Sequence, residues 1–164
     1  MTTIVYRDGI MATDSRAFSG HRSPIGFKKK LHVLPNGALV ASSSSDVGRT
    51  DAFAKWCIQA VNEGHPLPAC THDSKIGVQA LLVWTDGTVY YWNSRCFTGP
   101  LEAPFFAIGS GWEFALGALH AGATAEEAVR IASECDSLTG GPIQTAKLSP
   151  ISNPPNTPIS GVWP

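Results

Sequence analysis

Two Asp-Gly dipeptides, each set between runs of strand-forming residues, constrain the fold of this chain more than any other feature. They are Asp8-Gly9, between 3–7 and 10–14, and Asp86-Gly87, between 76–84 and 88–93. Asp-Gly accepts the positive φ angles of the tight turns that join antiparallel strands. The sequence therefore predicts two β-hairpins, and the first of them holds the N-terminus in a sheet.

The other elements fall into further strands and a set of helices. Strand-forming runs lie at 24–28, 29–34, 38–42, 103–108 and 142–148. Apolar spacing and helix-start signals predict helices at 46–61, 111–121 and 125–135. Because the helices are segregated from antiparallel strands, this order indicates an α+β fold in which helices cover sheets.

Each predicted helix begins near a residue that can cap its free N–H groups. The candidates are Asp46 or Thr50 for the first helix, Ser110 with Glu113 for the second, and Thr124 with Glu127 for the third. The last two pairs have the spacing of a capping box, so these two helix starts are the more strongly marked.

Composition limits the possible functions. At 164 residues the chain is expected to form one domain with its own core. A net charge of −1 gives no basic surface for nucleic acid, and no apolar run reaches the ~20 residues that span a bilayer. No secretory signal pattern opens the chain, so a cytoplasmic location is expected, with association with a virion left open. The four cysteines are scattered and expected to be reduced.

Two further segments have an unusual composition. From Pro150 the chain is too rich in proline for a central strand or a helix. An extended C-terminal arm is therefore expected at 149–164, after a domain at 1–148. A metal site built from one short loop has weak support, because no second pair of ligands accompanies His65, Cys70, His72 and Asp73. Neither a cofactor nor a metal is predicted.

Several short motifs, in order along the chain, carry a family resemblance. They are Met1-Thr2-Thr3-Ile4-Val5, Ala12-Thr13-Asp14-Ser15-Arg16, Lys29-Lys30-Leu31, Thr50-Asp51-Ala52-Phe53, Ala107-Ile108-Gly109-Ser110-Gly111 and Asp136-Ser137-Leu138-Thr139-Gly140-Gly141. Each is weak alone, but together they resemble the proteasome β-subunit family, HslV peptidases in particular, over most of residues 1–145. The resemblance implies the four-layer αββα sandwich of N-terminal nucleophile hydrolases.

The resemblance also implies a chemistry. In this family the side-chain oxygen of the first mature residue is the nucleophile, and its own α-amine is the base. Thr2 takes this role once Met1 is removed. Lys30 lies beside it and lowers the pKa of the amine, and Asp14 holds Lys30. Two alternatives stay open: Thr2 is an ordinary strand residue, and Lys30 is one solvated lysine of the run 28–30. As a surface-type lysine, Lys30 is expected to tolerate replacement by alanine with little loss of stability.

The remaining implied site residues support the amine and the oxyanion. Ser110, with Asp136 and Thr139 behind it, completes the hydrogen bonds at the amine, and Thr139 stands where the family has serine. The residues alone also allow Ser110 to be a helix cap and Asp136 a turn residue. Backbone N–H groups are implied to hold the oxyanion in a segment where the family has glycines and this chain has Ser42, Ser43 and Ser44.

The implied function is a threonine-type peptidase that works as a homo-oligomeric ring on peptides or unfolded proteins. An ATP-dependent unfoldase is left open as a second partner, and no nucleic acid or membrane partner is expected. One alternative is an inactive structural protein on the same fold, with Met1 retained and a bacteriophage origin left open. Another is a small-molecule amide hydrolase, for which no residue pattern specifies a ligand.

Overall fold

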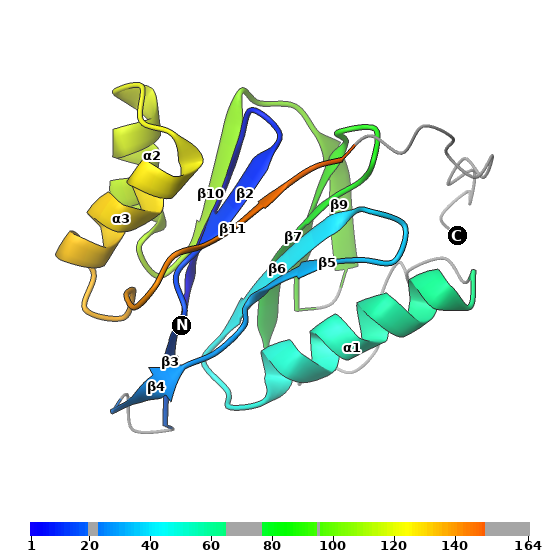
Figure 1. Ribbon diagram of the computed structural model, residues 1–164, viewed down its shortest axis with the longest axis horizontal. Coiled ribbons are helices and arrows are strands. Elements are labelled where there is room, and N and C mark those ends of the chain that lie inside the picture. Colours follow the sequence, from blue (N-terminus) through cyan, green and yellow to red (C-terminus); the bar gives the residue numbers. More distant parts are fainter. Residues whose placement is uncertain (20–22, 65–76, 95, 150–164) are drawn as a thin grey trace.

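The computed structural model describes residues 1–19, 23–64, 77–94 and 96–149. Within them, two antiparallel sheets stack face to face and helices cover the outer face of each (Figure 1). This four-layer αββα arrangement confirms the predicted α+β sandwich. The candidate metal-binding residues at 65–73 and the arm from residue 150 lie outside the described residues.

The first sheet has four strands in the order β10-β1-β2-β11. Their bounds are β1 (Thr3–Arg7), β2 (Ile10–Thr13), β10 (Phe105–Gly109) and β11 (Gln144–Lys147). Asp8 and Gly9 have φ angles of 51° and 76°, as the predicted tight turn requires. β1 therefore lies inside the sheet, with Thr3 opposite Gly109 and Ile4 opposite Thr13.

The second sheet has five strands in the order β5-β6-β7-β8-β9, and a separate ribbon pairs β3 with β4. The bounds are β3 (Arg16–Phe18), β4 (Pro24–Phe27), β5 (Leu31–Val33), β6 (Leu39–Ser44), β7 (Val78–Val83), β8 (Val89–Asn93) and β9 (Cys96–Leu101). The sequence did not predict β3 or β9. β3 is only three residues long, and Gly99-Pro100 within β9 is typical of a loop.

In the part of the chain that the structure describes, three helices complete the outer layers: α1 (Arg49–Asn62), α2 (Trp112–His120) and α3 (Ala125–Cys135). α1 packs on the five-stranded sheet, with Phe53 and Cys57 buried against Trp92 and its neighbours. α2 and α3 pack on the four-stranded sheet. Alternation along β1 sends Ile4 into the core between the sheets and Val5 into the helix layer.

The predicted helix caps are correct only for α3. Thr124 and Glu127 form both hydrogen bonds of a capping box. The cap predicted for α2 is wrong, because Gly111 occupies that position and the Ser110 hydroxyl bonds elsewhere. The cap predicted for α1 is also wrong, because Gly48 begins that helix in a left-handed conformation, with φ of 81°.

The cysteines differ from the expectation of four reduced thiols. Cys57 and Cys135 are free, whereas Cys96 is disulfide-bonded. Sequence spacing could not reveal this, because pairing depends on which Cα atoms the fold brings within about 7 Å. Burial raises the pKa of Cys57 to about 12, so its thiol is protonated and packs as an apolar group. No helix in the described part of the chain is long and apolar enough to span a bilayer.

Candidate active site

Thr2 lies directly before β1 and is 2% exposed. Its carbonyl oxygen accepts a hydrogen bond of 2.9 Å from the Ser110 N–H. Gly109 has a φ of 98°, and a β-carbon there would overlap the Thr2 carbonyl oxygen. The backbone around Thr2 is thus fixed by its close approach to β10.

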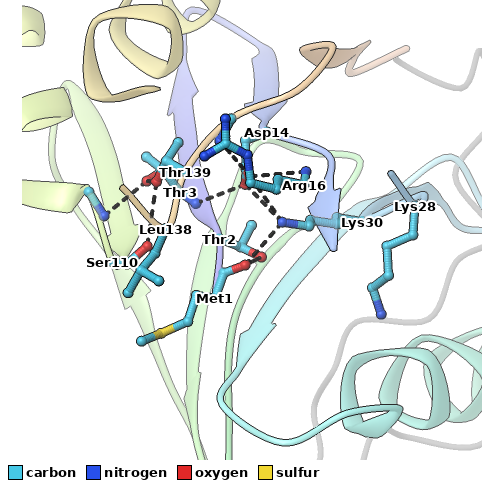
Figure 2. Close-up of polar contacts among 12 residues, drawn as sticks. Met1, Thr2, Thr3, Asp14, Arg16, Lys28, Lys30, Ser110, Leu138 and Thr139 are labelled. Atoms are coloured by element: carbon cyan, nitrogen blue, oxygen red, sulfur yellow. Dashed lines mark hydrogen bonds and ion pairs between the residues drawn. The ribbon is translucent and has the colours of Figure 1, made fainter. Parts of the chain in front are cut away.

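Lys30 and Asp14 form a buried ion pair beside Thr2 (Figure 2). The Lys30 ammonium is 3.1 Å and 3.0 Å from the two carboxylate oxygens of Asp14. Asp14 also accepts hydrogen bonds from the backbone N–H groups of Thr3, at 3.1 Å, and Gly140, at 3.0 Å. Burial raises the pKa of Asp14 and lowers that of Lys30, and the attraction between the two opposes both shifts.

The surroundings of the three neighbouring lysines separate their roles. Lys28 bonds Thr50 and Asp51 on the first turn of α1, and Lys29 is exposed. Lys30 is 3% exposed and is the one of the three whose ammonium bonds the Met1 carbonyl oxygen and Asp14. The expectation of a surface-type Lys30 is therefore wrong, because its removal would leave the Asp14 carboxylate buried without its partner.

Met1 contacts the site residues through its amine and its carbonyl oxygen. Its amine donates a hydrogen bond of 2.9 Å to the Ser44 carbonyl oxygen. Its own carbonyl oxygen accepts from the Thr2 hydroxyl and, at 3.0 Å, from the Lys30 ammonium. Burial, followed by the charge of Lys30, lowers the pKa of the Met1 amine. The Lys30 ammonium therefore lies against the peptide bond between Met1 and Thr2.

The serine segment, residues 42–44, lies next to Met1. β5 pairs with β6 only as far as Ala41, so Ser42, Ser43 and Ser44 extend past the described end of β5. On their other side they pair with β7. One backbone edge of the serine segment thus faces Met1, whose amine uses it at Ser44.

A second group of polar residues lies on the other side of Thr2. The Thr139 hydroxyl donates to Asp136 Oδ2 at 2.6 Å and is 3.4 Å from the Ser110 hydroxyl. Burial acts to raise the pKa of Asp136, but hydrogen bonds from Ser110 and Thr139 outweigh it and hold that pKa below its ordinary value. Asp136 is therefore ionised at neutral pH.

The predicted site residues thus lie together around Thr2, and Thr3 joins them without having been predicted. Its hydroxyl oxygen is 2.6 Å from that of Thr139 and accepts from the Gly111 N–H at 3.0 Å. The sequence did carry one signal for Thr3: it follows Thr2 in a strand, so its side chain lies on the opposite face of the sheet from that of Thr2. In the described residues, no group of three or more His, Cys, Asp or Glu side chains is arranged to hold a metal ion.

Comparison with known proteins shows the fold. No protein-family model and no curated protein sequence matches the chain. Among solved structures it is similar to HslV from Trypanosoma brucei, with TM-score 0.68 and 15% identity, covering 89% of this chain and 98% of that one. It is also similar to the proteasome-type protein BPH from Thiobacillus denitrificans, with TM-score 0.59 and 20% identity over 92% and 99% of the two chains. A structure of that BPH in complex with epoxomicin matches with TM-score 0.58 and 20% identity over 91% and 99%. The chain therefore has the proteasome/HslV-like fold of N-terminal nucleophile hydrolases.

Proposed function

We propose that this chain is a threonine-type peptidase whose nucleophile is Thr2, exposed by removal of Met1. The observation that carries the proposal is the Lys30 ammonium, 3.0 Å from the Met1 carbonyl oxygen and bound to Asp14. When Met1 is removed, the α-amine of Thr2 takes the place of the peptide nitrogen beside this ammonium. A nearby positive charge lowers the pKa of an amine and keeps it free to accept a proton.

The proposed reaction uses the two polar atoms of one residue. Thr2 Oγ1 attacks the carbonyl carbon of a peptide bond, and its proton passes to the α-amine of Thr2. The amine then protonates the leaving nitrogen as the peptide bond breaks, which leaves an ester on Thr2. A water molecule, deprotonated by the same amine, hydrolyses the ester and restores the hydroxyl.

The charged and polar neighbours have separate roles in this proposal. Lys30 sets the pKa of the amine, and Asp14 holds Lys30. Ser110, supported by Asp136 and Thr139, orients the amine. The open backbone edge of the serine segment supplies N–H groups for the oxyanion, and a serine can donate them as well as a glycine.

We also propose a homo-oligomeric ring that acts on peptides or unfolded proteins, with an ATP-dependent unfoldase as its second partner. The ring is supported by exposed apolar side chains on the β3–β4 ribbon, Ile25 at 64% and Phe27 at 65%. Light scattering of the full chain at micromolar concentration should give a multiple of the monomer mass. A monomer would contradict this part of the proposal.

Intact mass and labelling with epoxomicin test the chemistry. We expect a chain without Met1 that gains one epoxomicin molecule and cleaves peptides, and a Thr2→Ala variant that does neither. Epoxomicin is chosen because the BPH of similar fold has been solved with it. A chain that keeps Met1 in its host, or a processed chain that neither labels nor cleaves, would instead favour the inactive structural protein.

A further inference from the structure

We propose that Thr3 is a positioning residue that fixes Thr2 between two groups of residues. One group is the ion pair of Lys30 and Asp14, and the other is the polar group of Ser110, Asp136 and Thr139. The inference rests on the proposed function and adds a residue to it. Thr3 is fully buried and contacts both groups, through its backbone on one side and its hydroxyl on the other. No other described residue next to Thr2 in sequence makes both kinds of contact.

The backbone of Thr3 connects to the ion pair. Its N–H donates to Asp14 Oδ1 at 3.1 Å, the oxygen that also accepts from Lys30 at 3.1 Å. Because this nitrogen belongs to the peptide bond between Thr2 and Thr3, any shift of Asp14 moves the carbonyl end of Thr2. The same peptide bond carries the Thr2 carbonyl oxygen that accepts from Ser110.

The hydroxyl of Thr3 belongs to a chain of hydrogen bonds with one direction. Asp136 is an ionised carboxylate and can only accept, so the Thr139 hydroxyl uses its proton on Asp136. Thr139 must then accept from Thr3, at 2.6 Å. Thr3 in turn has no proton left for another partner and accepts from the Gly111 N–H. The order of donation is therefore Gly111, Thr3, Thr139, Asp136.

Because of this order of donation, a side chain without a hydroxyl cannot replace Thr3. A hydroxyl is needed because Thr3 accepts and donates at once, and valine of the same shape does neither. Space around it is limited, since a β-carbon at Gly111 would lie 2.6 Å from Thr3 Oγ1. Loss of the Thr3 hydroxyl would leave the Gly111 N–H without its acceptor and the Thr139 hydroxyl without the donor at 2.6 Å.

Thr13 offers a matched control. It lies on β2, is as fully buried as Thr3, and pairs with Ile4 of β1. Its hydroxyl oxygen, however, has no hydrogen-bond partner among the described residues. Thr3→Val and Thr13→Val therefore make the same chemical change in the same sheet, but only the first removes hydrogen bonds.

The experiment compares these two variants with Thr3→Ser in the full, processed chain. The rate of epoxomicin addition is followed by mass spectrometry, and exchange of the Gly111 amide by NMR. We expect Thr3→Val to slow labelling about tenfold to a hundredfold, the size of effect that a small misplacement of a reacting group produces. Gly111 exchange should rise at least tenfold. Thr3→Ser should restore both values to within about threefold of wild type, and Thr13→Val should change neither.

Several results would overturn the inference. One is wild-type labelling in a folded Thr3→Val variant, and another is a Thr3→Ser variant no better than Thr3→Val. If Thr3→Val does not fold, Thr3→Ser is compared with Thr3→Cys, whose thiol is a weak donor and acceptor; equal labelling rates then reject the inference. A wild-type chain that is processed and never labels rejects the proposed function itself, and Thr3 as its positioning residue with it.

Discussion

The Lys30 ammonium lies 3.0 Å from Asp14 Oδ2, with the two side chains 2% and 0% exposed. Removing one partner leaves the other charge buried, so we expect Lys30→Met to lower the free energy of unfolding by about 3–5 kcal/mol. Lys28→Met, which breaks a half-exposed pair with Asp51, should cost about 1 kcal/mol or less. Urea denaturation measures both. Equal losses would show that burial of the Lys30 pair has no energetic consequence.

The acid stability of the protein should depend on Asp136. Its folded pKa is held below its ordinary value, so between about pH 4 and that lower pKa the unfolded state binds more protons. The contribution of ionised Asp136 to the free energy of unfolding is therefore fully present above about pH 4, and it is lost as the pH falls through the folded pKa. Asp136→Asn should flatten this acid limb in thermal unfolding from pH 6 to pH 2. Thr139→Val, which removes one donor to the carboxylate, should flatten it in part. An unchanged slope in Asp136→Asn would contradict the assignment.

Two glycine-to-alanine changes should have opposite effects. A β-carbon at Gly109 would overlap the Thr2 carbonyl oxygen, and its φ of 98° disfavours any side chain. We expect Gly109→Ala to destabilise the fold by about 2 kcal/mol or more. Gly117 lies in the middle of α2 with nothing within 4 Å of a new β-carbon, so Gly117→Ala should stabilise by about 0.5–1 kcal/mol. Calorimetric melting temperatures that move in the same direction would disprove this contrast.

Arg7 should contribute more to stability than its partly exposed position suggests. Its Nη1 donates to the carbonyl oxygens of Leu119, at 3.0 Å, and Ala123, at 2.8 Å, at the C-terminal end of α2. Because a charged donor bonds the carbonyl oxygens at a helix C-terminus, we expect Arg7→Met to lower the free energy of unfolding by about 1.5–3 kcal/mol. Arg130→Met breaks an exposed pair with Glu134 and should cost about 0.5 kcal/mol or less. Chemical denaturation of the two variants decides whether the capping contact matters.

Local signals in the sequence predicted much of the fold. Asp8-Gly9 and the Thr124–Glu127 pair worked because a two-residue turn and a capping box are complete within a few residues. Ser110 failed as a cap because its hydroxyl has a tertiary partner, and local spacing carries no information about residue 139. The short ribbon strand β3 and the proline-containing β9 depend on neighbours far along the chain and could not be read locally.

The sequence likewise predicted some features of the candidate site and missed others. The motifs placed Asp14, Lys30, Ser110 and Asp136 in one neighbourhood, which the structure shows. They did not show that Lys30 is buried, because three successive lysines look alike until the fold selects one. Thr3 was missed because its part depends on a hydroxyl at Thr139 and a backbone N–H at Gly111, both more than a hundred residues away.

Because a two-residue turn at Asp8-Gly9 joins β1 and β2, the two arms of the first hairpin can change length only together. Ile4 faces the opposite sheet and Val5 the helices, so one extra residue in a single arm would exchange the faces of that arm. An extra residue in each arm leaves Thr2 and Asp14 on their present faces. Natural relatives and engineered versions of this chain should therefore differ in hairpin length by even numbers of residues.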